Sequence, residues 1–259
     1  MTLIDFFILI ISGVAVGFIN TLAGGGSTIS LSVLMLMGLS PAMANGTNRI
    51  GIAIQNIVGV SSFKQQGVLD AKKGILLAIP ATIGSVLGAY LAVDLNEEIF
   101  EKAMAVILLI MLVFILLNPQ KLIKEQTELV NRKLSWKQYV LFFFIGVYGG
   151  FIHVGIGYFL LASLIMGAGY ELVKANAVKV LIVLLYTPFS LAVFIWNDMI
   201  DYKMGFSLAI GTALGALIAS RMAVKRGAEF VRWVIVVIIL LTSAHLFRIV
   251  DFEQFFHKR

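Results

Sequence analysis

A glycine cluster and the hydroxyl residues beside it are the strongest candidates for chemistry in this sequence. They are Gly24, Gly25, Gly26, Ser27 and Thr28, and they interrupt an almost continuously apolar chain. Glycines at a helix break permit non-helical backbone, and the following helix presents free N–H groups at the positive end of its dipole. These donors predict an anion-binding site. Helix packing is the alternative, but packing seldom needs three glycines in a row. We expect packing alone for two other glycine pairs, Gly84/Gly88 and Gly211/Gly215.

A polar run follows at the start of a long apolar helix. It contains Asn45, Thr47, Asn48 and Arg49, and Gln55 continues it. Positions 48, 52, 55, 56 and 59 share one helix face, and four of these five residues are polar or glycine. Ionisable groups inside a membrane are costly and usually face a cavity or a partner, so Arg49 is a candidate for attracting a negative substrate. The alternative is that the asparagines cap the helix and Arg49 extends to a membrane interface.

A second, weaker copy of this pattern lies in the other half of the chain. Gly155, Gly157 and Tyr158 take the place of the glycine cluster, and Asn176 and Lys179 take that of the polar run. Lys179 is a further candidate for neutralising an anion, again with extension to an interface as the alternative. His153 is a candidate proton carrier, although a lone histidine is at least as often a hydrogen-bonding core residue.

The composition is that of a polytopic membrane protein. Of 259 residues, 60% are hydrophobic and 13% are charged, against roughly 45–50% and about 25% in soluble domains. The sequence has no cysteine, which excludes disulfides and thiolate metal sites, and its three histidines form no metal-binding motif. The first apolar segment begins with Asp5 and has no small-residue cleavage site, so we expect it to be mature structure rather than a signal peptide. Basic residues lie in short loops beside apolar segments, which predicts membrane orientation rather than nucleic-acid binding.

Ten apolar segments, five in each half, are cut at glycine, proline and charged residues. They are Ile4–Leu22, Ile29–Met37, Ile50–Phe63, Ile75–Val93, Ile99–Leu117, Tyr139–Ile152, Tyr158–Met166, Val178–Trp196, Phe206–Met222 and Val231–Phe247. A polar stretch separates the halves. We therefore predict an N-terminal transmembrane repeat over 1–117, a cytoplasmic linker over 118–137 and a C-terminal transmembrane repeat over 138–259.

The two halves align collinearly with a shift of about 131 to 133 residues, which indicates a tandem repeat. Matched residues include Gly13 with Gly146, Gly17 with Gly150, Phe18 with Phe151, Asp70 with Asp201, and Gly84 with Gly215. Corresponding loops carry opposite charge: the basic loop at Lys72 matches the acidic loop at Asp201, and the acidic loop at Glu97 matches the basic loop at Lys225. The positive-inside rule then gives the halves opposite orientations, which predicts an inverted-topology repeat.

The second segment of each half is too short to cross a membrane. Nine residues make about 14 Å of helix, against a hydrocarbon core of about 30 Å. We expect the first two segments of each half to form a re-entrant pair with glycines at its tip, and the other three to cross. Five short, tilted crossings per half are the alternative. Both interpretations place the two termini outside.

The chain resembles the sulfite exporter TauE/SafE family of membrane permeases over essentially its whole length. The resemblance lies in AGGGS at 23–27 with the apolar half-helix after it, Gly38-Leu39-Ser40-Pro41, the run from Ala42 to Asn48, and GGFIHVGIGYFLL and KANAVKV in the second half. Family members often carry a proline in that half-helix, where this sequence has Leu31-Ser32-Val33. The resemblance implies export, or in some members uptake, of sulfite, organosulfonates or other small sulfur-containing or carboxylate anions.

These observations predict an all-α polytopic protein of the cell inner membrane that acts as a secondary transporter of small anions. The anion would bind near the midplane between the repeats, and rocking of the halves would alternate access. An anion channel, or an uptake permease for small carboxylates, is the alternative. An enzyme is disfavoured because no paired carboxylates, triad or metal cluster falls in the apolar segments. Expected partners are the anion, the lipid bilayer, a coupling proton or ion and a second copy of the chain in a homodimer; no cofactor, metal or nucleic acid is expected.

Overall fold

Helices dominate the described part of the chain, in which no strand occurs. The structure is a computed structural model that describes residues 1–94, 99 and 134–246. Its helices are α1 (Leu3–Leu22), α2 (Ser27–Leu36), α3 (Pro41–Gln65), α4 (Ala71–Asp94), α6 (Trp136–Phe151), α7 (Ile156–Ala162) with a π-helical turn η3 (Ser163–Gly167), α8 (Leu172–Trp196) and α9 (Tyr202–Leu246). The predicted segment Ile99–Leu117, apart from Ile99, and most of the predicted linker lie outside the described residues. Trp136 and Lys137, at the end of that linker, lie in the first turn of α6.

Four of the described helices are long and apolar enough to cross a membrane. They are α1, α4, α8 and the Tyr202–Val231 part of α9. The predicted all-α, polytopic membrane class is therefore confirmed. With 20 residues, α1 is about 30 Å long and reaches the thickness of a hydrocarbon core by itself, whereas the 10 residues of α2 reach about half of it. The re-entrant pairing of α1 with α2 stays a prediction.

The central helices begin earlier than their hydropathy predicts. α3 begins at Pro41 rather than Ile50, and α8 at Leu172 rather than Val178. Ser40 is the N-cap of α3 and accepts a hydrogen bond from the Met43 N–H, while Pro41 occupies a first-turn position that needs no N–H donor. The polar run is therefore helical. The alternative in which its asparagines cap the helix is wrong, because Asn45 and Asn48 lie inside α3.

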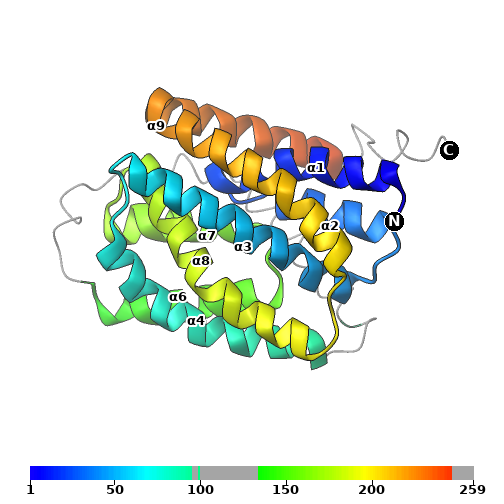
Figure 1. Cartoon of the computed structure of the whole chain (residues 1–259). Helices are drawn as coiled ribbons and strands as arrows, with labels where there is room; N and C mark the ends of the chain where they lie inside the picture. The colour runs from blue at the N-terminus through cyan, green and yellow to red at the C-terminus, as the bar shows by residue number, and fades with distance from the viewer. Residues whose placement is uncertain (95–98, 100–133, 247–259) are drawn as a thin grey trace.

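The predicted segment Phe206–Met222 and residues 231–246 of the predicted segment Val231–Phe247 belong to one element, α9. Its limbs meet at Gly227, which has a φ of 74° and breaks the helical geometry. Only glycine adopts this left-handed conformation without strain. Figure 1 shows the second limb turning back from this kink.

Two helix pairs flank a central pair (Figure 1). α1 packs on α9, α6 packs on α4, and α3 and α8 lie between these pairs. Glycines let the backbones touch: Gly88 lies against the Val147 carbonyl, and Gly215 lies against the Val14 carbonyl. The packing role predicted for the pairs Gly84/Gly88 and Gly211/Gly215 is confirmed.

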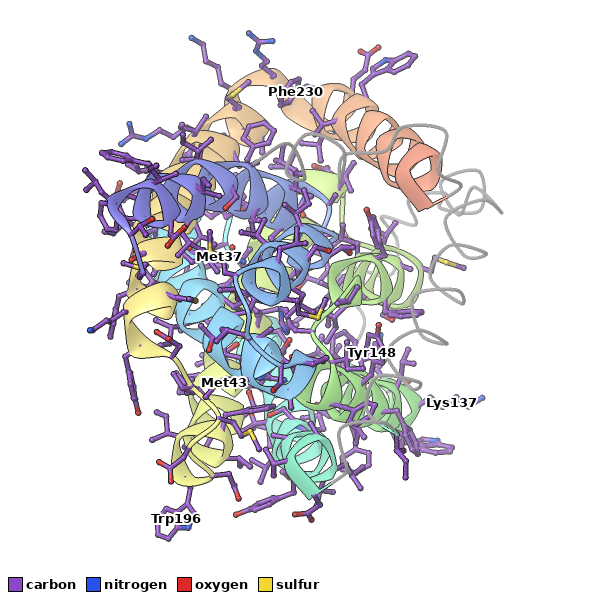
Figure 2. All side chains as sticks on the ribbon, turned by 90° about the vertical axis from the view of Figure 1, so that its right-hand side faces the viewer. Met37, Met43, Lys137, Tyr148, Trp196 and Phe230 are labelled. Carbon is purple, nitrogen blue, oxygen red and sulfur yellow. The ribbon has the colours of Figure 1, made fainter. Side chains whose placement is uncertain are left out.

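Large apolar side chains cover the outside of the helices. The exposed faces of α4 and α9 repeat them every fourth residue: Ile75, Ile79, Ile83 and Leu87 on α4, and Phe206, Ile210, Leu214 and Ile218 on α9. Trp196 is 90% exposed and projects from the end of α8 at the edge of the molecule (Figure 2). Such surfaces suit lipid tails, with tryptophan at the headgroup level. The protein is thus embedded in a membrane.

Hydrogen bonds connect neighbouring segments at the end of the helices where the basic loops lie. These segments include the loop between α3 and α4 and the loop before α8. The Gln66 side chain donates to the Ser220 carbonyl, Gln138 donates to the Gly167 carbonyl, and the Tyr170 hydroxyl donates to the Asp70 carboxylate at 2.6 Å. Burial, together with the bond to Asp70, raises the pKa of Tyr170, so its hydroxyl remains the donor.

The opposite end joins the start of α3 to the loop between α8 and α9. The Asp201 N–H donates to the Thr47 hydroxyl at 2.9 Å, and Gly46 lies against the Met199 carbonyl. Because α3 begins where α8 ends, the two central helices run antiparallel.

Candidate functional site

The two glycine tips meet inside the molecule. Gly24 lies between α1 and α2, Gly157 is in the first turn of α7, and their backbones are in direct contact. Gly24 and Gly155 have φ values of 95° and 68°, which favour glycine. The Tyr158 hydroxyl lies against Gly25, where an added Cβ would come within 2.6 Å of it. The structure therefore brings together the predicted glycines of both halves.

The start of α2 keeps unused donors. Among the described residues, no group accepts a hydrogen bond from the backbone N–H groups of Gly25, Gly26 and Ser27. The Asn20 amide lies beside them, 3.4 Å from the Ser27 hydroxyl and 3.5 Å from the Gln55 amide oxygen. Thr28 is half-buried at the same helix end. A helix start with free N–H groups carries a partial positive charge.

Lys179 caps the end of a helix in the other half of the chain. Its ammonium group donates to the carbonyl oxygens of Asn20 and Thr21, both at 2.9 Å, and to the Asn176 amide oxygen at 2.7 Å. These bonds use all three ammonium donors. Lys179 is 2% exposed, so it does not extend to an interface. Its partners are the last carbonyls of α1, the negative end of that helix.

Arg49, in the first half of the chain, caps the end of a helix in the second half. From α3 it donates to the carbonyl oxygens of Gly149 (3.2 Å) and Gly150 (2.5 Å) near the end of α6, and to the Ser190 hydroxyl at 2.9 Å. Its guanidinium carbon lies 4.5 Å from the centre of the Phe194 ring. Arg49 is fully buried, so extension to an interface is wrong for it too. The Asn45 amide donates to the Phe151 carbonyl at the same helix end.

Several buried polar atoms next to these caps have no partner among the described residues. They are Asn45 Oδ1, both amide atoms of Asn48, Arg49 Nε and Asn176 Nδ2. A buried polar atom without a hydrogen bond is unfavourable and needs an explanation. A bound polar ligand is one that would satisfy several of them together.

His153 lies between α6 and α7, where its Nδ1 is 3.0 Å from the Tyr186 hydroxyl. The residue is buried, and the contact fits both interpretations given above, a proton carrier and a core histidine. Thr47 is the predicted site residue that lies away from the tips, because its hydroxyl is bonded to the loop before α9.

Three partners in this site were not predicted. Asn20, Tyr186 and Ser190 are buried and bond to candidate residues. Asn20 could have been predicted from the sequence, since it is a lone amide in an apolar segment, four residues before the glycine cluster. Tyr186 and Ser190 carried none, because single hydroxyls are common in apolar helices.

Known proteins resemble this chain over nearly its whole length. The family model described as Sulfite exporter TauE/SafE matches residues 9–246. A probable membrane transporter protein of Haemophilus influenzae is 27% identical over 92% of this chain and 93% of its own length. The probable membrane transporter protein YfcA of Escherichia coli K12 is 27% identical over 89% of this chain and 85% of its own, and the probable membrane transporter protein ORF9 of Sinorhizobium is 24% identical over 92% and 90%. No solved structure matches. Since the family model covers nearly all of it, this chain belongs to the TauE/SafE sulfite exporter family.

Proposed function

We propose that this protein is a secondary transporter that exports small anions such as sulfite, organosulfonates or related sulfur oxyanions. The observation that carries the proposal is the set of buried polar atoms on the central helices α3 and α8 that have no partner among the described residues. Free N–H groups at the start of α2 accompany it. The description of the family model names sulfite export, and the relatives carry the names of membrane transporters.

The electrostatics of the glycine tips support an anion. Gly25, Gly26 and Ser27 offer backbone donors at the positive end of α2. The buried charges of Lys179 and Arg49 lie at the ends of α1 and α6, where they offset the negative helix ends that would otherwise repel an anion. In this proposal the two cations act mainly through their field, and the N–H and amide groups contact the oxygens of the substrate.

The packing supports an inverted repeat with alternating access. α1 packs on α9 of the second half, and α6 packs on α4 of the first. Each half supplies the cation that caps the first helix of the other. The matched helices α3 and α8 run antiparallel. Two halves that interlock in this way can rock about a site at their interface. The basic loops would lie on the cytoplasmic side of an inner membrane. A coupling proton or ion and a homodimer belong to the same proposal.

Flux through reconstituted protein tests the function. The purified chain in liposomes is given radiolabelled sulfite with unlabelled sulfonates, thiosulfate or dicarboxylates as competitors, with and without a pH gradient. We expect saturable flux that sulfur oxyanions inhibit and that responds to the gradient. Flux that rises linearly with concentration would favour an anion channel, and competition by dicarboxylates alone would favour a carboxylate permease. Folded protein without flux of any anion would contradict the proposal.

A further inference from the structure

We propose that the substrate is a small oxyanion that also carries a hydrogen-bond donor, an O–H or N–H group, and that the amide oxygens of Asn45 and Asn48 accept from this donor. The inference rests on the anion-transport function proposed above and narrows its substrate class. It starts from the chemistry of the unpartnered atoms.

The partners of two amides fix which of their atoms is free. The Asn45 amide faces the Phe151 carbonyl at 2.8 Å, and a carbonyl only accepts, so the atom facing it is the nitrogen and the free atom is the oxygen. The Asn176 amide faces the Lys179 ammonium at 2.7 Å, and an ammonium only donates, so its free atom is the nitrogen. Neither amide atom of Asn48 has a partner among the described residues, so Asn48 offers one free donor and one free acceptor whichever way its amide is turned.

The free atoms therefore include acceptors as well as donors. The donors are Asn48 Nδ2, Asn176 Nδ2 and Arg49 Nε, and the acceptors are Asn45 Oδ1 and Asn48 Oδ1. The side chains of all four residues are at most 2% exposed. An ion with oxygen acceptors alone would satisfy the donors and leave the two amide oxygens facing its negative charge. A donor on the same ion removes this conflict.

Helix geometry places the two asparagines on a face of α3 that runs from the end of α6 towards the start of α2. Asn45 and Asn48 lie on successive turns of one face of α3, and Gln55 continues that face two turns later. Asn45 contacts the end of α6, and Gln55 contacts Asn20 beside the start of α2. Asn48 lies on this face between Asn45 and Ile52, and Ile52 belongs to the core cluster that also contains Ala23 and Ile156, next to the two glycine tips.

A matched pair of ligands tests the donor. 2-Hydroxyethanesulfonate and ethanesulfonate have the same sulfonate group and the same two-carbon chain and differ in one hydroxyl. We expect the purified full-length chain to bind the hydroxylated ion about tenfold more tightly or better by calorimetry, because a site built around a substrate hydroxyl disfavours the analogue that lacks it. Glycolate against acetate repeats the comparison on a carboxylate.

Variants assign the preference to the asparagines. Asn48→Leu should reduce the affinity ratio of the two sulfonates to near one. Asn197→Leu, at the exposed end of α8, should leave the ratio as in the unaltered chain. If Asn48→Leu does not fold, Asn48→Asp keeps an acceptor but adds a negative charge; it should weaken both sulfonates and keep the hydroxyl preference.

The outcomes separate this inference from the function on which it rests. Equal binding of the two sulfonates, with saturable sulfite flux intact, would overturn the donor requirement alone. A hydroxyl preference that survives in both Asn48→Leu and Asn45→Leu would overturn the role of the asparagines. Failure of every anion to bind or to be transported would overturn the proposed function and this inference together.

Discussion

The two cations that are buried in the described part of the chain, Lys179 and Arg49, find their partners at helix ends. Lys179 binds the last carbonyls of α1, and Arg49 binds those of α6. A helix C-terminus carries about half a negative elementary charge, so a full positive charge placed on it leaves a positive remainder of similar size. Each cation can therefore complete a helix and still make its surroundings favourable for an anion.

Replacement of Lys179 by methionine should destabilise the protein. The change removes the donor for the Asn20 and Thr21 carbonyls and for the Asn176 amide, and a buried group left without a partner costs about 1–3 kcal/mol. Removing a buried charge offsets part of this, so we expect a net loss of about 1–3 kcal/mol, measured as a lower unfolding temperature in detergent.

Lys174→Met is the matched control for this prediction. Lys174 lies on the same helix, and its side chain is exposed, so the same substitution there should change stability by less than about 0.5 kcal/mol. Equal unfolding temperatures for the two variants would mean that the Lys179 cap does not hold α1 in place.

At the scale of elements, the contact between the two glycine tips determines how closely the halves approach. Gly24 is in backbone contact with Gly157, whereas no described residue lies within 4 Å of a Cβ added at Gly38, and both glycines have a φ of 95°. A comparison of alanine substitutions at Gly24 and Gly38 therefore separates the cost of backbone strain from the cost of steric collision.

Gly24→Ala should be far more damaging than Gly38→Ala. Alanine at φ 95° costs about 1–2 kcal/mol at either position, but at Gly24 its methyl group also collides with the Gly157 backbone, which cannot rotate away as a side chain could. We expect Gly38→Ala to purify as a folded, active protein, and Gly24→Ala to lose transport and elute as an altered or aggregated species in size-exclusion chromatography. Similar behaviour of the two variants would contradict the tip contact.

Helix boundaries were predictable where glycine or charge cuts the chain. The ends of α1 and α2 lie within two residues of the prediction, because Gly24 to Gly26 and Gly38 interrupt both helices. The start of α3 was misplaced by nine residues, since hydropathy treats Asn45 to Arg49 as a break. In a membrane protein, polar residues continue a helix wherever they are buried against other protein groups.

The contacts between the halves were not predictable from the sequence. Arg49 meets a carbonyl 100 residues away, and Lys179 meets one 159 residues away. Residue types indicated that both cations need partners, but no local pattern indicates which backbone carbonyl a side chain reaches. The sequence therefore identified most members of the candidate site and not the bonds between them.

At the scale of the whole molecule, the packing revises the alignment of the two halves. The predicted alignment, with its shift of 131 to 133 residues, matches Gly84 with Gly215, yet the neighbours of these two glycines differ. Gly215 lies against the Val14 carbonyl and the Phe18 N–H, and the equivalent neighbours, Val147 and Phe151, lie against Gly88 instead. The match is displaced by one helical turn, because the first limb of α9 reaches its glycine pair four residues sooner after Asp201 than α4 does after Asp70. The local register differs, and the pairing of helices is the same.

The orientation of the molecule can be tested directly, because the chain has no cysteine of its own. Lys72 lies at the end of the helices where the basic loops gather, and Asn197 lies at the opposite end; both are exposed. The positive-inside rule predicts that Lys72 faces the cytoplasm. In intact cells, a membrane-impermeant maleimide should therefore label Asn197→Cys, and it should label Lys72→Cys only after the membrane is permeabilised. The opposite pattern would reverse the molecule in the membrane without changing its fold. Labelling of both cysteines from outside would contradict the placement of the two loops at opposite ends, and with it the antiparallel course of α3 and α8 on which the inverted repeat depends.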